Sequence, residues 1–476
     1  MSTTRSPLNL RSVLVYALML AGTFGLFLLI RSHGETLVAS ISAEPRGFTP
    51  SSGAEPADVL LHVLLALAAV VVTGRLVGSL FVWLGQPPVI GEVVGGILLG
   101  PSLLGWIAPD VSAFVLPTTI VPHLGVIAQL GVILYMFLVG LELNAELLRN
   151  RAHTTVAISH ASIVVPFILG SVLALDLYPR LSSSDVPFTS FALFMGVAMS
   201  ITAFPVLARI LTDRKMAKTE LGVMALTCAA ADDVTAWCLL AFVVGVVQSK
   251  IDSALRIALL TLAYLGFMFL VVRPVVARLV ASGKNRQPSQ HAIALTLVAV
   301  LLSALMTEMI GVHAIFGAFL LGAVIPHDSS LARALTQKLE DFVTILLLPA
   351  FFAFTGMRTQ IGLVSGIENW LICGLIILVA TFGKFGGTLV AARCTGQSWR
   401  NAAGLGILMN TRGLMELIVL NIGLDLRVIS PTLFAMMVLM ALVTTIATTP
   451  LLQRIVPQQA MESDADEMIT PYVCSI

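Results

Sequence analysis

Three ionisable residues lie deep inside apolar segments of this sequence, where a charge is expensive. Asp232 and Asp233 are near the middle of the stretch 220–248, and Lys384 is about as deep within 369–393. Each costs roughly 2.5–3.5 kcal/mol at the centre of a membrane helix. One structural ion pair would account for the lysine and one of the acids. The other carboxylate would then have no partner, which predicts a functional site.

A carboxylate in such a setting suits the reversible binding of small cations. Burial in a low dielectric favours its protonated form, and a nearby ammonium group favours its charged form. The group can hold a proton or a dehydrated cation but not both at once, so competition for one site would produce exchange. Successive helical residues point about 100° apart. One of the two aspartates can therefore face a cation while the other faces Lys384, and their titrations would be coupled.

A site at the middle of a membrane also needs irregular backbone, because unwound segments supply carbonyl groups and helix ends. Two segments of the sequence predict such breaks. Residues 200–205 (SITAFP) contain a proline, which removes a backbone donor and disfavours helix at the residue before it. Residues 409–413 (MNTRG) form a polar run between leucines. The candidate site residues from these two runs are Ser200, Thr202, Asn410 and Thr411.

The elements that position these residues must be membrane helices. Of the 476 residues, 57% are hydrophobic and only 11% are charged, and the mean hydropathy is +0.97. A soluble protein carries about 25% charged residues, and a helix needs roughly 20 apolar residues to cross a bilayer. The chain therefore predicts an all-α polytopic membrane protein. We expect fourteen spans, near 11–30, 57–84, 87–107, 118–142, 153–176, 188–211, 220–248, 254–281, 289–309, 311–326, 341–357, 369–393, 401–423 and 430–453.

The distribution of Lys and Arg predicts the orientation. With the N-terminus inside, sixteen basic residues lie at cytoplasmic ends of the spans and seven lie outside, so by the positive-inside rule both termini are cytoplasmic. Basic residues precede the first span as in a signal peptide. Its apolar run is longer than the usual 7–15 residues or so, and we expect a retained extra N-terminal helix.

An internal repeat supports a transporter built from two inverted halves. Residues 95–100 (GGILLG) recur as 317–322 (GAFLLG), and 137–141 (FLVGL) match 353–357 (AFTGM). A single connecting span between two six-span halves requires that the halves have opposite orientations. The predicted organisation is an N-terminal helix at 1–31, an extracytoplasmic linker at 32–56, a first repeat at 57–248, a connector at 249–288, an inverted repeat at 289–454 and a cytoplasmic tail at 455–476.

Seven stretches together resemble the monovalent cation:proton antiporter-2 family, which includes bacterial sodium/proton exchangers and plant cation/proton exchangers. The likeness runs in order over about 57–453. The matching stretches are 86–92 (QPPVIGE), 95–102 (GGILLGPS), 202–211 (TAFPVLARIL), 231–237 (ADDVTAW), 311–319 (GVHAIFGAF), 383–388 (GKFGGT) and 409–425 (MNTRGLMELIVLNIGLD).

The resemblance implies the inverted-repeat sodium/proton antiporter fold, with about thirteen core helices, two crossed broken helices, a dimerising domain and elevator-like alternating access. It implies that Asp233 is the cation ligand, that Asp232 pairs with Lys384, and that oxygens around Thr202 and Asn410–Thr411 complete the site. Two acids with a lysine are similar to the electrogenic subclass. The run 409–425 is instead similar to the plant branch, where Asn often precedes the Asp.

The sequence leaves several alternatives open. An intramembrane aspartyl protease would need two carboxylates on separate helices, whereas these are consecutive, so we expect no enzyme and no cofactor. A cation channel would not need a titrating site. An electroneutral potassium/proton exchanger is the other alternative, although we expect sodium. The net charge of +1 predicts no nucleic-acid partner. The expected setting is a homodimer in a bacterial inner membrane, acting in pH homeostasis.

Overall fold

The computed structural model describes residues 10–39, 56–142, 152–217, 219–248, 251–282 and 288–455. All regular elements in these ranges are helical. Twelve of the described helical segments are long and apolar enough to cross a membrane, and one further pair of helices is bent by 43° at a short break. These observations confirm the prediction of an all-α polytopic membrane protein.

Two of the predicted spans differ from the helices that the structure contains. The span expected at 311–326 is the short helix α15 (Ala314–Val324), which follows a left-handed Gly311 (φ 96°) at the end of α14 (Gln290–Ile310). The span expected at 341–357 is the second half of a segment that runs over Ser330–Leu363. Its first half is rich in polar residues, which hid it from a reading based on apolar runs.

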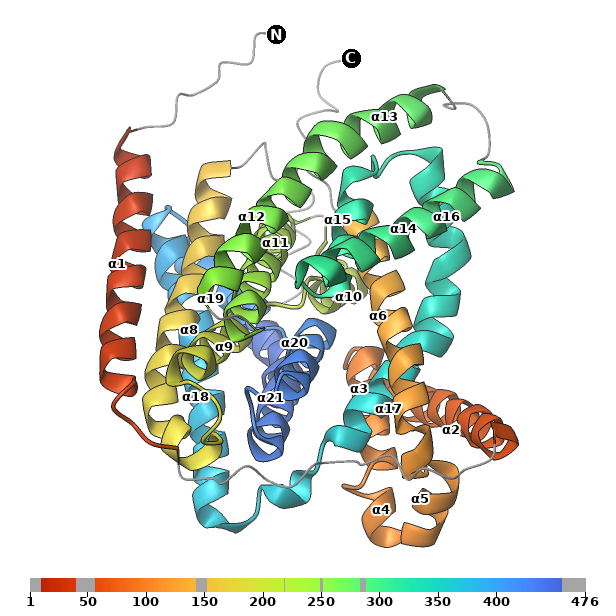
Figure 1. Cartoon of the computed structure of the whole chain (residues 1–476). Helices are drawn as coiled ribbons and strands as arrows, with labels where there is room; N and C mark the ends of the chain where they lie inside the picture. The colour runs from red at the N-terminus through yellow and green to blue at the C-terminus, as the bar shows by residue number, and fades with distance from the viewer. Residues whose placement is uncertain are drawn as a thin grey trace.

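The helices pack in two bundles, which lie on the two sides of Figure 1. What we call the site bundle consists of α8 (Ala152–Leu181), α9 (Phe188–Ser200), α10 (Phe204–Asp213), α11 (Glu220–Gln248), α18 (Gly366–Cys394), α19 (Trp399–Met409), α20 (Leu414–Asp425) and α21 (Pro431–Ile455). What we call the flanking bundle consists of α2 (Pro56–Trp83), α3 (Pro88–Leu99), α6 (Val121–Glu142), α14, α15, α16 (Ser330–Phe342) and α17 (Leu348–Arg358).

The remaining helices connect or cover these bundles. A connector follows α11 in the chain and leads to α14. It consists of α12 (Ile251–Phe267), a π-helical turn (Met268–Val272) and α13 (Arg273–Ser282). Two short helices, α4 (Leu104–Ile107) and α5 (Pro109–Val115), lie below the flanking bundle in Figure 1. Short 3-10 turns at Thr118–Ile120 and Ile361–Leu363 and a π-helical turn at Val343–Leu347 complete the described elements.

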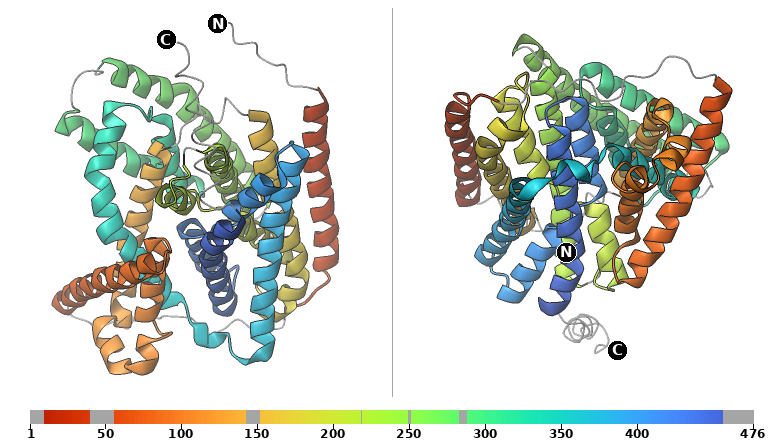
Figure 2. Two further views of the ribbon diagram at one scale, coloured as in Figure 1. Left: turned by 180° about the vertical axis from the view of Figure 1, so that it is seen from behind. Right: turned by 90° about the horizontal axis from the view of Figure 1, so that it is seen from below.

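The N-terminal helix α1 (Leu10–Gly34) packs on the outside of the site bundle, against α8 and α9. The rings of Phe27 and Phe167 are 6.0 Å apart, and Thr189 donates a hydrogen bond to Glu35 at 3.2 Å. Figure 2 shows α1 and α2 at opposite sides of the molecule. Helix α1 thus adds an outer layer to the site bundle. Retention of the whole segment 1–31 stays a prediction.

The two glycine motifs of the predicted repeat contact each other reciprocally. A Cβ atom on Gly100 in the first half would collide with the carbonyl of Gly356 in the second half. In the same way, a Cβ atom on Gly322 would collide with the backbone of α6 next to Gly140. The motif at 95–100 therefore packs on the one at 353–357, and the motif at 317–322 packs on the one at 137–141. Two halves related by a pseudo-two-fold axis would make this reciprocal pair of contacts. The boundaries of the repeats stay predictions.

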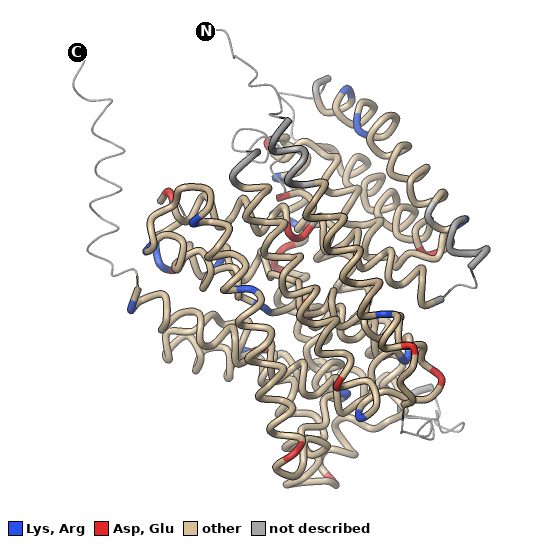
Figure 3. The backbone as a smooth tube through the Cα atoms, turned by 90° about the vertical axis from the view of Figure 1, so that its left-hand side faces the viewer, with Lys and Arg blue, Asp and Glu red and all other residues tan. Residues whose placement is uncertain are grey.

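The charged residues are distributed as a membrane protein requires. Figure 3 shows long stretches of helix without Lys, Arg, Asp or Glu, charges near the ends of helices, and charged positions inside the bundle. Interior charges are rare in membrane spans and mark functional positions. The interior positions include the three residues singled out in the sequence, Asp232, Asp233 and Lys384, which are all buried.

Candidate ion-binding site

Two helices of the site bundle are broken at its centre, and their breaks contact each other. Helix α9 ends at Ser200 and α10 begins at Phe204, whereas α19 ends at Met409 and α20 begins at Leu414. The amide of Ala203 donates to the carbonyl of Thr411 at 2.9 Å. This bond pairs one backbone group of each break across the crossing, which is the kind of partner that unwound backbone inside a membrane requires. This arrangement confirms the two crossed broken helices.

Proline accounts for the first break. Pro205 occupies the first turn of α10, where its missing N–H is not needed and its fixed φ suits a helix start. The residue before it is disfavoured from helical geometry, so α9 cannot run on into α10. The second break has no proline and follows the polar run at Asn410, whose backbone N–H still closes the last turn of α19.

Asp232 lies in a complete shell of hydrogen-bond donors. Its Oδ2 atom accepts from Lys384 Nζ at 3.0 Å. The hydroxyl of Thr202 donates to the same Oδ2 atom at 3.0 Å or to the carbonyl of Met409 at 3.1 Å. Lys384 also donates to Thr202 Oγ1 at 2.6 Å. Two serines of α8 also contact the carboxylate: Ser159 donates to Oδ1 at 2.6 Å, and Ser162 donates to Oδ2 at 2.6 Å or to the carbonyl of Ser159 at 2.8 Å. Asp232 and Lys384 are 0% exposed, so this is a fully desolvated ion pair.

Asp233 has different surroundings although it is the next residue. Its Oδ2 atom is buried and has no hydrogen-bond partner among the described residues. The side chain borders a small pocket whose other walls come from Ile201, Ala236, Trp237, Leu240, Met415 and Val419. A buried carboxylate oxygen left unpaired costs about 1–3 kcal/mol or more. The unpaired oxygen makes Asp233 a candidate ligand-binding residue.

The other predicted site residues separate into two kinds. Asn410 Oδ1 and Thr411 Oγ1 are buried at the second break and have no hydrogen-bond partner among the described residues. The hydroxyl of Ser200 has partners elsewhere, because it donates to the carbonyls of Gly196 at 2.6 Å or Ile163 at 3.0 Å. The structure thus brings Thr202 to Asp232 and Lys384, leaves oxygens of Asn410 and Thr411 free, and shows no contact of Ser200 with either aspartate.

Arg412 stabilises the end of the broken helix α9. Its guanidinium group donates to the carbonyls of Ala198 at 3.0 Å and Met199 at 2.7 Å, and it pairs with Glu416 at 2.9 Å. Both side chains are 0% exposed. A cation at the C-terminal end of a helix interacts favourably with its dipole. The spacing of four residues indicates the pair with Glu416. It does not indicate that Arg412 also binds carbonyl groups of α9.

Close packing of α18 on α8 positions the lysine. A Cβ atom on Gly383 would lie 2.8 Å from the Cα atom of Pro166, and one on Gly387 would lie 2.9 Å from the carbonyl oxygen of Ala161. Glycine at both positions therefore lets the two helices approach closely. Lys384 lies between them in sequence, which explains why its ammonium group reaches a carboxylate on α11 that the serines of α8 also contact.

Sequence reasoning missed Ser159 and Ser162. Serine in a membrane helix is common, because its hydroxyl can bond to a carbonyl one turn earlier. The spacing of three residues, which puts both hydroxyls on one face of α8, is the signal that could have identified them. The described residues contain no cluster of three or more His, Cys, Asp or Glu side chains that could hold a resident metal ion.

The fold agrees with what comparisons with known proteins show. The family model for the transmembrane region of sodium/hydrogen exchangers matches residues 63–456. The chain belongs to the sodium/hydrogen exchanger family. It is therefore a multi-pass membrane protein that exchanges cations for protons, as the resemblance noted in the sequence predicts.

Three individual likenesses illustrate this membership. The chain is 45% identical over 406 residues to the Na(+)/H(+) antiporter NhaS4 of Synechocystis, covering 85% of this chain and 99% of that protein. It is 40% identical to cation/H(+) antiporter 20 of Arabidopsis thaliana, but spans only about half of that protein (84% and 49% covered). The sodium proton antiporter MjNhaP1 of Methanocaldococcus jannaschii has the same fold, with a TM-score of 0.57 at 15% identity over 85% of this chain and 99% of that one.

Proposed function

We propose that this antiporter exchanges sodium for protons at Asp233. The observation that carries the proposal is the buried Oδ2 atom of Asp233. It has no hydrogen-bond partner in the part of the chain that the structure describes, whereas the neighbouring carboxylate of Asp232 is paired with Lys384. A proton or a dehydrated cation would satisfy this atom, and binding of one would displace the other. Asn410 and Thr411, whose side-chain oxygens have no partner among the described residues, and Thr202 at the facing break are the further ligands that we propose, because hard monovalent cations prefer oxygen.

Sodium is the proposed cation, on the basis of the likeness to NhaS4 over nearly the whole of that protein. Potassium uses the same kinds of oxygen ligand and remains the competing assignment, in an electroneutral exchanger. We propose electrogenic exchange of two protons for one cation, because a second ionisable pair, Asp232 and Lys384, adjoins Asp233. The second proton would reside on a member of this pair, and the three groups would titrate together.

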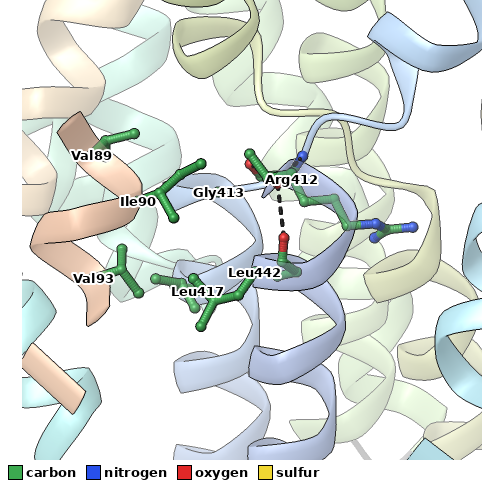
Figure 4. A pocket seen from close by; sticks show the side chains of 9 residues that line it. Val89, Ile90, Val93, Arg412, Gly413, Leu417 and Leu442 are labelled. Carbon is green, nitrogen blue, oxygen red and sulfur yellow. Dashed lines mark hydrogen bonds between the residues drawn. The ribbon is translucent and has the colours of Figure 1, made fainter. Parts of the chain in front are cut away.

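Alternating access would come from movement of the site bundle past the flanking bundle, in an elevator-like manner. Figure 4 shows apolar side chains of α3 (Val89, Ile90 and Val93) facing Leu417 and Leu442 of the site bundle across a small pocket. The guanidinium group of Arg412 points away from this pocket toward α9. Apolar surfaces without interlocking hydrogen bonds can slide at low cost.

A small number of polar contacts cross between the bundles and would break in that movement. Arg358 at the end of α17 donates to Asn421 at 3.0 Å and to Asp425 at 2.5 Å, both on α20. Gln86 donates to the carbonyl of Ile446 at 3.2 Å. In the proposed cycle these contacts hold one of the two end states.

The wider setting is also a proposal. We place the protein as a homodimer in a bacterial inner membrane with both termini in the cytoplasm, in a role in pH homeostasis. The excess of Lys and Arg on one side of the predicted spans supports the orientation. The two repeats would be 57–248 and 289–454, and each contributes three spans to each bundle.

Proteoliposomes containing the purified protein test the proposed function. We expect sodium added outside to drive proton efflux from acid-loaded vesicles, with lithium and potassium compared in parallel. If potassium alone drives proton movement, the exchanged cation is potassium and not sodium. Cation current that flows without proton movement would indicate a channel and would overturn it.

Thr202→Val should weaken the apparent affinity for the cation by about tenfold without abolishing exchange. The change removes one side-chain oxygen and a hydrogen bond to a charged group, worth roughly 1.5 kcal/mol or more, and leaves the backbone carbonyls of the break. The measurement is the sodium concentration that gives half-maximal proton flux. Thr202→Ser keeps the hydroxyl and serves as the control. An affinity equal to wild type in the valine variant would remove Thr202 from the cation site.

A further inference from the structure

The break between α19 and α20 is also held by a third element, helix α21. The backbone amide of Arg412, which lies outside both short helices, donates to Thr445 Oγ1 of α21 at 2.9 Å. The hydroxyl of Thr445 in turn donates to the carbonyl of Arg412 at 2.7 Å or to that of Ala441, in its own helix, at 2.8 Å. Thr445 is buried. A side chain of α21 therefore supplies the acceptor for a backbone group of the break.

This bond fixes one end of a rigid unit. The N–H of Arg412 belongs to the same peptide unit as the carbonyl of Thr411, and a peptide unit is planar. At the other end of the unit, this carbonyl accepts from the amide of Ala203 in the first break at 2.9 Å. The peptide plane is thus held from two sides, by the first broken helix and by α21. The two bonds restrict its rotation, and with it ψ of Thr411 and φ of Arg412.

The side chains that we propose as cation ligands at the second break adjoin this peptide unit. Asn410 Oδ1 and Thr411 Oγ1 are buried and have no hydrogen-bond partner among the described residues. No hydrogen bond of their own oxygens therefore sets their direction, which depends on the backbone that carries them. Bonds from other elements have to support that backbone, because a helical ladder is interrupted at a break.

The neighbouring threonines of α21 make a different kind of contact. Thr444 donates to the carbonyl of Met440 at 2.9 Å or of Ala441 at 3.1 Å, and Thr448 donates to the carbonyl of Thr444 at 3.0 Å. Such bonds to the preceding turn are common for threonine in membrane helices. Thr445 differs from Thr444 and Thr448 because its oxygen also accepts from the broken segment.

The surroundings of the Arg412 amide on this side offer few other acceptors. Thr445 lines the pocket between the two bundles together with Arg412 and Gly413. The other side chains in its wall are all apolar: Val89, Ile90, Val93, Leu417, Ala441 and Leu442. A buried amide that loses its acceptor is destabilised, so the break would have to rearrange without the hydroxyl of Thr445.

We propose that Thr445 is a positioning residue for cation binding, which orients Asn410 and Thr411 by holding the peptide unit between Thr411 and Arg412. The inference rests on the proposed cation site and deepens it, because it names a residue outside the broken helices that sets the geometry of their oxygens. Thr445 acts through the backbone and does not itself bind the cation. Its loss should therefore weaken cation binding while the exchange step at Asp233 continues.

The test is the sodium dependence of proton flux in proteoliposomes containing Thr445→Val, which removes the acceptor but keeps a branched side chain. We expect the sodium concentration for half-maximal flux to rise by about tenfold, as loss of one supporting hydrogen bond predicts, and the flux at saturating sodium to stay close to wild type. Thr445→Ser keeps the hydroxyl and should restore the wild-type value. Thr445→Cys offers only a weak acceptor and should lie between serine and valine, which gives a measurable order even if the valine variant does not fold.

Thr444→Val is the matched control. Thr444 is the adjacent residue and is also buried, but its hydroxyl bonds within its own helix. A general effect of losing a buried hydroxyl from α21 would appear in both valine variants, whereas the proposal predicts a wild-type sodium dependence in Thr444→Val. Equal shifts at the two positions, or wild-type values in both Thr445→Cys and Thr445→Val, would overturn the role of Thr445.

A double-mutant cycle with Thr411→Val tests whether Thr445 acts through the proposed ligands. Removing the ligand should remove part of the effect of Thr445→Val, so the double variant should shift the half-maximal concentration by less than the product of the two single shifts. Shifts that multiply fully would contradict the positioning role and leave exchange at Asp233 intact. Absence of cation-coupled proton flux in the wild-type protein would instead overturn the proposed function. If potassium drives the wild-type protein, the same comparisons are made with potassium.

Discussion

Asp233→Asn is expected to abolish cation-coupled proton exchange for sodium, lithium and potassium alike, and to raise the thermal stability of the protein. The amide cannot take up a proton or neutralise a cation, so neither half of the cycle can proceed. The same change replaces a buried carboxylate, whose Oδ2 atom has no partner among the described residues, by a neutral amide, which costs less to bury than a charge. Proton flux in vesicles and the melting temperature in detergent measure the two effects.

Asp232→Asn is the matched control at the neighbouring position. It leaves the buried ammonium group of Lys384 without its counter-ion, and loss of one partner from a buried pair typically costs about 3–5 kcal/mol. The two variants should therefore change stability in opposite directions, although each replaces one carboxylate by an amide. Residual exchange in Asp233→Asn, or a lower melting temperature like that of Asp232→Asn, would contradict the assignment of Asp233 as the ligand that alternates.

The centre of the site could be predicted from the sequence because of the cost of burying charge. A lysine deep in an apolar segment has few possible counter-ions, and the adjacent acids at 232 and 233 lie near the middle of another apolar segment. The structure places Lys384 3.0 Å from Asp232. The breaks could be predicted for a similar reason, since Pro205 cannot continue a helix from Ser200, and the polar run at Asn410 interrupts an otherwise apolar segment.

The rest of the site depends on packing that a single sequence does not specify. The hydroxyls of Ser159 and Ser162 reach Asp232 only because α8 lies against both α11 and α18, and no local pattern determines which helix a serine will face. Arg412 illustrates the same limit. Its pairing with Glu416 follows from helical spacing, whereas its bonds to the carbonyls of Ala198 and Met199 depend on how the two broken helices cross.

Helix lengths in the flanking bundle were harder to predict for another reason. The segment Ser330–Leu363 begins with an amphipathic helix, α16, whose charged residues lower its mean hydropathy. A search for apolar runs therefore finds only the part after Asp341. Helix α15 presents the opposite case, because it is strongly apolar but only 11 residues long. It packs against α6 and α14, so hydrophobic burial and not length accounts for its composition.

Lys384→Gln is expected to leave exchange active but to make it independent of the membrane potential. In the proposed cycle one cation with a single charge moves against two protons, so wild-type exchange carries net charge. Glutamine still donates a hydrogen bond toward Asp232 but cannot release a proton. Exchange then continues at Asp233 alone, one cation for one proton, without net charge. The measurement is the initial rate of sodium-driven proton flux at several imposed potassium-diffusion potentials, for both proteins.

The variant must also remain folded, and the donors around Asp232 make this feasible. Removing Lys384 breaks a buried ion pair, but the carboxylate keeps the hydroxyl groups of Ser159, Ser162 and Thr202 as donors. We therefore expect a loss of stability smaller than the 3–5 kcal/mol or so of an unsupported buried pair. Lys384→Arg controls for charge, because a guanidinium group stays protonated: it should also exchange one for one. If wild-type exchange is already independent of the potential, the two-proton cycle is wrong and Lys384 is a structural counter-ion of Asp232.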